Sequence, residues 1–171
     1  PDLVGFSLYD TSIHCGRVFS LQLKAERPQM PIIYGGPGAS PWNVKRGRDF
    51  ERGAVDAVVI GEGELSGLEA VERLGRQAPL EGCLGILHRD SDGQVKQEPV
   101  RGNIHLNELP IPYFDDFDFA QYREQSLPIM MSRGCVAKCS FCSETRYWNK
   151  FRYREADHIV REMAQNTAQG R

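Results

Sequence analysis

Three cysteines stand within eight residues and form the pattern Cys-x3-Cys-x2-Cys at Cys135, Cys139 and Cys142. Thiolates bind zinc and iron–sulfur clusters, and so tight a loop lets three sulfurs converge on one centre. A structural zinc site usually has four protein ligands. A cubane [4Fe–4S] cluster on three thiolates instead leaves one iron open, which a small molecule can chelate. We therefore predict an iron–sulfur cluster on these three residues.

Two other interpretations of the cysteines stay open. They could form a zinc knuckle completed by His158, which lies 16 residues beyond Cys142, or they could be incidental. The remaining cysteines, Cys15 and Cys83, stand alone in apolar surroundings, so we expect both to be small buried hydrophobic residues. An odd number of cysteines, mostly clustered, favours metal binding in the reducing cytoplasm over a secreted disulfide framework.

In the first hundred residues, short apolar runs that resemble buried strands alternate with helical patterns. The expected strands are 2–8, 31–34 and 55–60, and the expected helices are 12–25, 40–52 and 66–76. This βαβ spacing predicts a parallel sheet with helices on both faces. Ser40 and Pro41 resemble an N-cap followed by a first-turn proline. A hairpin with strands 85–88 and 94–97 should pair at the sheet edge.

The remainder of the chain differs from the first hundred residues in its composition and in its pattern of apolar residues. Residues 102–127 are rich in proline and then in alternating acidic and aromatic residues, which indicates a linker. A strand is expected at 128–131, leading directly into Cys135, and a helix at 155–168. In parallel α/β folds ligands bind at such carboxyl ends of strands. We therefore expect a domain at 1–101, a linker at 102–127 and the start of a second domain at 128–171.

Composition excludes several classes of protein. The chain has 171 residues, of which 40% are hydrophobic, and a net charge of −2, so no nucleic-acid footprint is indicated. It contains no apolar run near the roughly 18 residues that a membrane helix needs. It begins at Pro1 without an initiator Met or a signal peptide, so we expect it to be an internal piece of a longer cytoplasmic protein.

The segment SRGCVAKCSFC at 132–142 resembles the CxxxCxΦC signature of the radical S-adenosylmethionine (SAM) superfamily, with Phe141 as the aromatic Φ. The resemblance implies that 128–171 begins a (β/α) barrel. It also implies a [4Fe–4S] cluster whose open iron binds SAM and cleaves it reductively to a 5′-deoxyadenosyl radical. Phe141 would lie against the adenine, although it could equally be a core aromatic. Arg133 and Lys138 would be cationic neighbours of the cluster or solvent-facing charges.

The first hundred residues resemble the cobalamin-binding domain that precedes the barrel in one branch of that superfamily. The matching segments are 2–7 (DLVGFS), 32–37 (IIYGGP), 55–64 (VDAVVIGEGE) and, in the linker, 109–112 (LPIP). The resemblance implies a flavodoxin- or Rossmann-like α/β domain in which Ser7, Gly35 and Gly36 border the corrinoid's nucleotide tail. Glu62 and Glu64 would cap the following helix or face the corrin or the neighbouring domain. For each of these residues a tight βα turn without a ligand is the alternative.

The same resemblance implies what lies outside the chain. The first strand of the domain and the cobalt-ligating DxHxxG motif would precede Pro1. His14 has the wrong spacing to replace that motif and is expected on a helix surface. Only 29 residues follow Cys142, so the glycine-rich SAM-binding strand end would lie beyond Arg171.

The predicted function is therefore that of a radical SAM enzyme fragment. It would act with cobalamin on a small-molecule substrate, by methyl transfer, oxidative cyclisation or a methylthiotransfer-like step. An electron donor such as flavodoxin or ferredoxin would reduce the cluster. The alternatives are a corrinoid carrier module with a zinc or iron–sulfur knuckle and no catalysis of its own, and a zinc-stabilised interaction protein.

Overall fold

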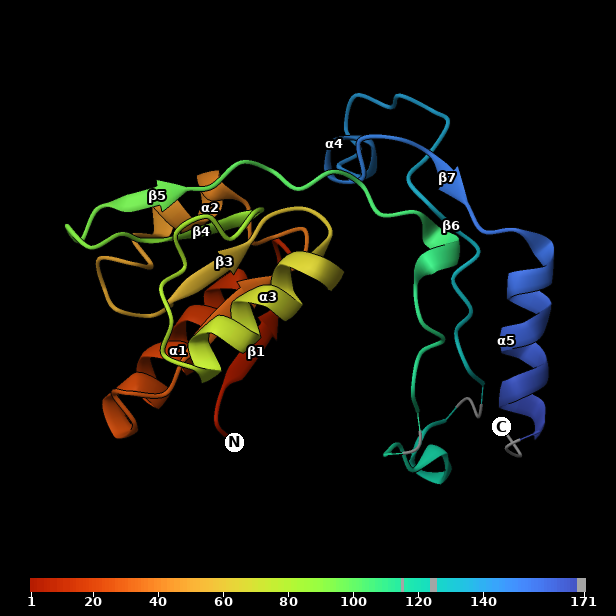
Figure 1. The fold of residues 1–171 in the computed structure, drawn as a ribbon, viewed down its shortest axis with the longest axis horizontal. Coiled ribbons are helices and arrows are strands. Elements are labelled where there is room, and N and C mark those ends of the chain that lie inside the picture. Colours follow the sequence, from red (N-terminus) through yellow and green to blue (C-terminus); the bar gives the residue numbers. More distant parts are fainter. Residues whose placement is uncertain (115, 124–125, 169–171) are drawn as a thin grey trace. The chain divides into compact units, whose positions relative to one another are not determined.

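The computed structural model describes residues 1–114, 116–123 and 126–168, and it divides into two compact units, Pro1–Asn103 and Ile104–Arg171 (Figure 1). Asp115 of the predicted acidic-aromatic stretch and residues 124–125 of the predicted linker lie outside the described residues. No helix in the described part of the chain is long and apolar enough to span a membrane.

A five-stranded sheet forms the centre of the first unit (Figure 1). Its strands, in spatial as well as chain order, are β1 (Val4–Ser7), β2 (Ile32–Gly35), β3 (Ala57–Val59), β4 (Ile86–Arg89) and β5 (Val95–Gln97). The first three strands pair in parallel, whereas β4 and β5 are antiparallel. The predicted α/β fold and the hairpin at the sheet edge are therefore confirmed.

Three helices belong to this unit: α1 (Ile13–Glu26), α2 (Pro41–Gly47) and α3 (Gly63–Gly75). The predicted N-cap of α2 is confirmed, because the Ser40 Oγ accepts a hydrogen bond from the Asn43 N–H at 3.2 Å and Pro41 occupies the first turn. The predicted end of this helix at residue 52 is wrong. Arg48 adopts the left-handed conformation, with φ 55°, and ends the helix at Gly47.

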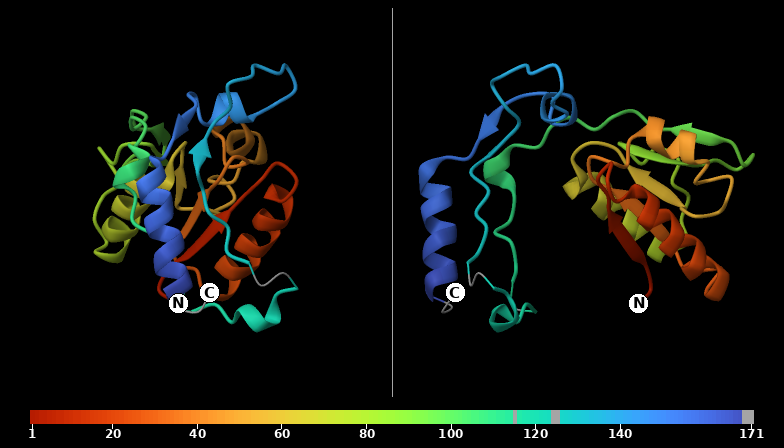
Figure 2. Two further views of the ribbon diagram at one scale, coloured as in Figure 1. Left: turned by 90° about the vertical axis from the view of Figure 1, so that its right-hand side faces the viewer. Right: turned by 180° about the vertical axis from the view of Figure 1, so that it is seen from behind.

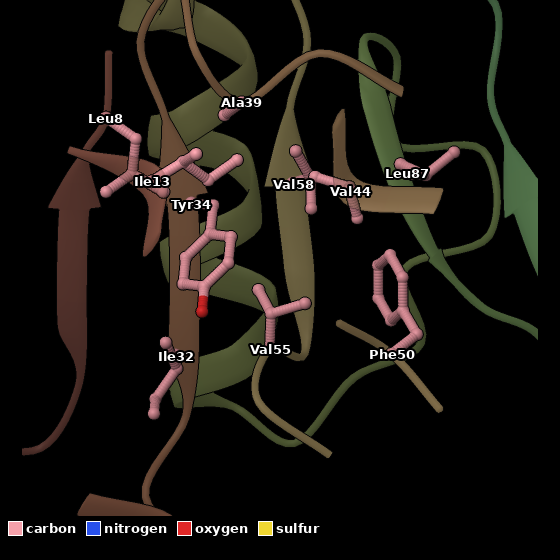
Figure 3. Packing of buried hydrophobic residues seen from close by; sticks show 10 residues of the cluster. All are labelled: Leu8, Ile13, Ile32, Tyr34, Ala39, Val44, Phe50, Val55, Val58 and Leu87. Carbon is pink, nitrogen blue, oxygen red and sulfur yellow. The ribbon is translucent and has the colours of Figure 1, made fainter. Parts of the chain in front are cut away.

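Alternate residues of the strands supply two hydrophobic clusters, one on each face of the sheet. Tyr34 and Val58 pack with residues of α1 and α2 in the first cluster (Figure 3). Ile33 and Val59 pack with Ala70 of α3 in the second. Helices thus cover both faces, which explains why the strands are apolar on both sides. The Tyr34 hydroxyl donates to the Ser20 Oγ at 2.9 Å, and burial raises the pKa of Tyr34 to about 12.

Two predictions about buried residues fail for geometric reasons. Cys83 is buried as predicted, but Cys15 is exposed because α1 directs Ile13, Gly16 and Ser20 inward instead. The spacing of Leu68, Val71 and Leu74 predicts one apolar face on α3, but Leu68 is 57% exposed and Val71 43%. The residues buried on this helix are Ser66 and Ala70. Small side chains allow α3 to lie close to the sheet, which leaves Leu68 outward, while Leu74 packs against the second cluster.

The second unit has little regular structure. Its elements are η1 (Leu106–Glu108), η2 (Phe119–Gln121), β6 (Ser132–Arg133), α4 (Glu144–Tyr147), β7 (Arg152–Tyr153) and α5 (Ala156–Ala168). The helix predicted at 155–168 is confirmed by α5. The strand predicted at 128–131 is wrong, because the antiparallel ladder with β7 forms at 132–133 instead (Figure 2). The predicted domain boundaries and the barrel itself stay predictions.

The aromatic side chains of the predicted linker pack on one another. The rings of Phe117 and Phe119 are stacked with centroids 6.3 Å apart, and Phe114 contacts both of them edge-on at 6.0 and 6.3 Å. Tyr122 lies 6.1 Å from Phe119. This local cluster gives the irregular segment a small apolar centre.

The hairpin contains a carboxylate whose ionisation should make the stability of the first unit pH-dependent. The Lys96 ammonium, 2.9 Å from Glu98, and the nearby His88 ring lower the pKa of the Glu98 carboxyl from 4.5 to about 2. Its contribution to stability is therefore complete above about pH 4.5 and is lost as the pH falls towards 2. We expect Glu98→Gln to lower the urea midpoint at pH 7, and the difference from wild type to shrink below pH 4.5.

Urea titrations at several pH values, followed by circular dichroism, measure this difference. Glu72→Gln, at an exposed position of α3, is the control. A difference between Glu98→Gln and wild type that stayed constant down to pH 2 would contradict the prediction.

Candidate functional sites

Parallel pairing brings the predicted residues of the first unit to one edge of the sheet. Ser7 and Gly35 are the last residues of β1 and β2, and they face each other in the register. Gly36 follows directly, and a Cβ placed on it would lie 3.2 Å from the Ser7 Oγ. Glu62 follows the neighbouring strand β3 at the N-cap of α3. This carboxyl edge is where open α/β sheets bind ligands.

Tight packing of two loops explains some of the glycines without any ligand. Gly36 has φ 86°, and a Cβ there would lie 2.7 Å from the Leu8 carbonyl oxygen. At Gly38 a Cβ would lie 2.3 Å from the Tyr9 carbonyl carbon, and the Gly38 N–H donates to the Leu8 oxygen at 2.8 Å. For these two positions the βα turn itself requires glycine.

Gly35 is different, because neither its backbone nor its neighbours require glycine. A Cβ at Gly35 would meet only the Val59 Cβ, at an ordinary contact distance of 4.0 Å. At Gly61, after β3, a Cβ would meet nothing within 4 Å, although its φ of 79° does favour glycine. The strand ends therefore leave open backbone that a bulky ligand could approach closely.

Two aromatic residues near this edge were not among the predicted site residues. Tyr9 follows β1 and is 60% exposed, and Trp42 lies in the first turn of α2 and is 72% exposed. Asn43 joins their loops, because its Nδ2 donates to the Asp10 Oδ1 at 2.7 Å and to the Gly38 oxygen at 3.0 Å. In the sequence, Tyr9 stands just after an expected strand and Trp42 at the start of an expected helix. These positions could have identified both residues as candidates for ligand binding.

The side chain of Glu62 does not have the predicted capping role. It occupies the N-cap of α3 with φ −72° and ψ 126°, but no capping hydrogen bond forms from its carboxylate. Glu64 lies in the first turn of the same helix, where a negative charge interacts favourably with the helix dipole. His14 is exposed on α1, as predicted.

The three predicted ligand cysteines lie on one loop between β6 and α4. Cys135 and Cys139 are exposed and Cys142 is half-buried. The Cys135 Sγ accepts a hydrogen bond from the Ala137 N–H at 3.4 Å, and the Cys142 N–H donates to the Cys139 oxygen at 3.1 Å. All three thiols are therefore reachable from solvent and free of disulfides.

The two centres predicted for these thiols, a zinc knuckle and a cubane cluster, both stay predictions. Zinc–sulfur bonds of about 2.3 Å in a tetrahedron place the sulfurs about 3.8 Å apart. Among the described residues, the three sulfur atoms do not all lie within 4.8 Å of one another. His158, the predicted fourth zinc ligand, instead groups within 4.8 Å of Glu155 and Asp157 at the start of α5. Three thiolates can serve as ligands in either kind of centre.

Phe141 lies between the last two cysteines and is 90% exposed. It is therefore not a core aromatic in the described unit, and its ring is accessible to a ligand. Lys138 is also exposed, whereas the Arg133 guanidinium lies over the Trp148 ring, 4.9 Å from its centroid. This contact joins the two ends of the cysteine loop.

Curated relatives match nearly the whole chain. An uncharacterized methyltransferase of Pyrococcus horikoshii is 30% identical over 96% of this chain and 36% of its own length. The anaerobic magnesium-protoporphyrin IX monomethyl ester cyclase of Rubrivivax gelatinosus is 27% identical over 95% of this chain and 30% of its own. Hopanoid C-3 methylase of Methylococcus capsulatus is 27% identical, with 95% and 32% covered. The chain thus spans about a third of the length of these relatives.

Solved structures with a similar fold agree with the sequence relatives. The cobalamin-dependent SAM radical enzyme OxsB, with aqua-cobalamin bound, has a TM-score of 0.72 at 20% identity, covering 96% of this chain and 23% of that one. The radical SAM methyltransferase TsrM from Kitasatospora setae, with cobalamin and a [4Fe–4S] cluster bound, has a TM-score of 0.70 at 18% identity, with 99% and 36% covered. No family model matches the chain. The comparisons confirm the predicted resemblance and fold.

The two adjacent glycines should respond differently to substitution by alanine. Gly36→Ala should destabilise the first unit by about 1–3 kcal/mol, because it strains a left-handed backbone and meets Leu8. Gly35→Ala should change the free energy of unfolding by less than about 1 kcal/mol, because its Cβ has room. Urea unfolding followed by circular dichroism compares the two variants. Equal effects would mean that the Leu8 backbone does not restrict the residue at position 36.

Proposed function

Because the chain is related in sequence and in fold to cobalamin-dependent radical SAM enzymes, we propose that it is a piece of such an enzyme. In this proposal Cys135, Cys139 and Cys142 hold a [4Fe–4S] cluster, whose open iron binds SAM. When bound, the cluster supplies the electron that cleaves SAM to a 5′-deoxyadenosyl radical. The exposed ring of Phe141 is placed to contact the adenine of SAM.

The observation that carries the cluster assignment is the donor set itself. Three accessible thiols lie on one short loop, in the spacing Cys-x3-Cys-x2-Cys. Cysteine thiolates are the usual ligands of iron–sulfur clusters. The iron that three cysteines leave without a protein ligand is what a SAM-binding cluster needs.

The carboxyl edge of the sheet supports the cobalamin part of the proposal. Gly35 leaves open backbone beside Val59 that the packing of this chain does not use. Ser7 and Gly36 border the same point, and the exposed rings of Tyr9 and Trp42 lie on the adjoining loops. We propose that the nucleotide tail of a corrinoid lies against Ser7, Gly35 and Gly36, and that Glu62 faces the corrin side.

We propose methyl transfer as the reaction of the parent enzyme, with oxidative cyclisation as the second candidate. Several relatives are named as methyltransferases or methylases, and two are named as cyclases. One structural neighbour was solved with tryptophan as its substrate, which supports a small-molecule substrate here. A carrier module without catalysis would use the first unit alone.

Charge supports an acidic electron donor such as flavodoxin or ferredoxin. Residues 133–152 contain five basic residues and one acidic residue, although the whole chain has a net charge of −2. Opposite charge accelerates encounters between redox partners. Exposed thiols and an iron–sulfur cluster also suit a reducing compartment, so we propose a cytoplasmic location.

Removal of one ligand tests the cluster. After anaerobic reconstitution with iron and sulfide, the wild-type chain should bind about four irons and absorb light at about 400 nm. Cys139→Ala should lose both the bound iron and this absorbance. Cys15→Ala is the matched control, because Cys15 is an exposed cysteine outside the motif. Stoichiometric zinc without iron in the wild type, or a cluster that survives in Cys139→Ala, would overturn the assignment.

A methyl group at the sheet edge tests the cobalamin site. Gly35→Ala should weaken hydroxocobalamin binding about tenfold or more, because the added methyl fills the space that the ligand would occupy. Equilibrium dialysis with corrin absorbance measures the binding. Gly5→Ala, at an open position within β1, should bind as wild type does. No binding by the wild-type chain, or equal binding by Gly35→Ala, would count against the site.

A further inference from the structure

The cysteine loop has a narrow base where its two ends meet. The strands β6 and β7 flank the cysteine loop together with α4, and they pair over only two positions, Ser132 with Tyr153 and Arg133 with Arg152. Between them, Gly134 lies against the backbone of Lys150, where a Cβ would approach the Lys150 oxygen to 2.6 Å. So short a ladder gives little resistance to a shift of one strand along the other.

Arg154 extends this pairing with both its main chain and its side chain. Its N–H donates to the Met131 oxygen at 2.8 Å, and its Nη1 donates to the Met130 oxygen at 3.1 Å. The same guanidinium forms an ion pair with Glu162 on α5. One residue thus holds two consecutive carbonyls of the segment that enters the loop, and α5 runs alongside that segment (Figure 2).

The ion pair is almost completely buried, with Arg154 7% and Glu162 1% exposed. Removing two charges from water is costly, and replacing such a pair with apolar residues is often neutral or stabilising. Within the described residues, the Arg154 Nε and the Glu162 Oε1 have no hydrogen-bond partner, which adds to the cost. Stability alone is therefore a poor explanation for the pair.

Position is the better explanation. Cys135 lies four residues beyond Met131, so a slip of the entering segment by one residue would move it by about 3.3 Å. Metal–ligand distances tolerate only about 0.2 Å. The cysteines themselves are exposed or half-buried, so little packing in the described unit can correct such a shift. The register at the loop base therefore decides where the first thiol lies.

We propose that Arg154 and Glu162 are a positioning pair that fixes the register of the cysteine loop, so that its three thiols can hold the cluster. This inference rests on the proposed function, because it concerns the ligands of the same cluster. Neither residue would touch the cluster. The guanidinium acts through the Met130 carbonyl, beside the Met131 carbonyl that the Arg154 main chain holds, and Glu162 anchors the guanidinium to α5.

The test replaces the pair with apolar residues of similar size, in the double variant Arg154→Met/Glu162→Leu. Its unfolding midpoint and helix content should stay near those of wild type, because no unpaired charge is left buried. Its reconstituted cluster should release iron to a chelator about 10–100-fold faster, the usual cost of losing groups that orient metal ligands. Glu162→Gln, a nearly isosteric change, is the second variant and should shift iron release in the same direction.

Hydrogen exchange of the metal-free chain supplies a readout that does not need the cluster. Exchange should accelerate in residues 130–135 of the double variant and stay unchanged in the sheet of the first unit. The control is Asp157→Asn/Arg161→Gln, which removes an exposed ion pair of the same helix. It should match wild type in both iron release and exchange.

The outcomes separate the two proposals. Equal exchange at the loop base in the double variant and wild type overturns the positioning role, whether or not a cluster forms. Equal iron release in the two proteins overturns it as well. A wild-type chain that takes up no cluster overturns the proposed function, and the exchange rates then decide the positioning role by themselves.

Discussion

Parallel pairing of β1, β2 and β3 is the constraint from which the first unit follows. It aligns Ser7 with Gly35 and brings three strand ends to one edge. The loops that leave this edge must then pass close to one another, which is why Gly36 and Gly38 lie against the backbone of Leu8 and Tyr9. Helices on both faces bury the apolar strands, so the edge is the part of the sheet left for binding.

The second unit must position its cysteine loop with few helices and strands. Its three thiols lie on an exposed loop, and such a loop can place ligands only as well as its base is held. Two paired positions, the contact of Arg133 with Trp148, and the buried guanidinium of Arg154 supply that base. Backbone contacts thus position the loops of the first site, and backbone and side-chain contacts together position the cysteine loop.

The resemblance to larger enzymes suggests a ligand for each of these two candidate sites. The chain spans about a third of its curated relatives, and their names include methyltransferases and cyclases. In the proposed function, an iron–sulfur cluster that cleaves SAM and a corrinoid that carries a methyl group are complementary parts of one reaction. Phe141, with its exposed ring, and Gly35, with its open backbone, are the residues on which the proposed function places these two ligands.

The sequence by itself determined the local features of this protein. Alternating apolar and helical segments specified the α/β unit, Ser40 and Pro41 specified the start of α2, and the spacing of the cysteines put three thiols on one loop. These features depend on near neighbours in the chain, which a sequence displays directly.

Only the tertiary structure decided the features that depend on distant residues. The close approach of Ala70 to the sheet turned Leu68 outward, and the inward face of α1 left Cys15 exposed. Pairing with β7 moved the predicted strand at 128–131 to β6, and the partnership of Arg154 with Glu162 appeared only when α5 packed beside it. Register and helix rotation are set by contacts between elements, so no local pattern could have shown them.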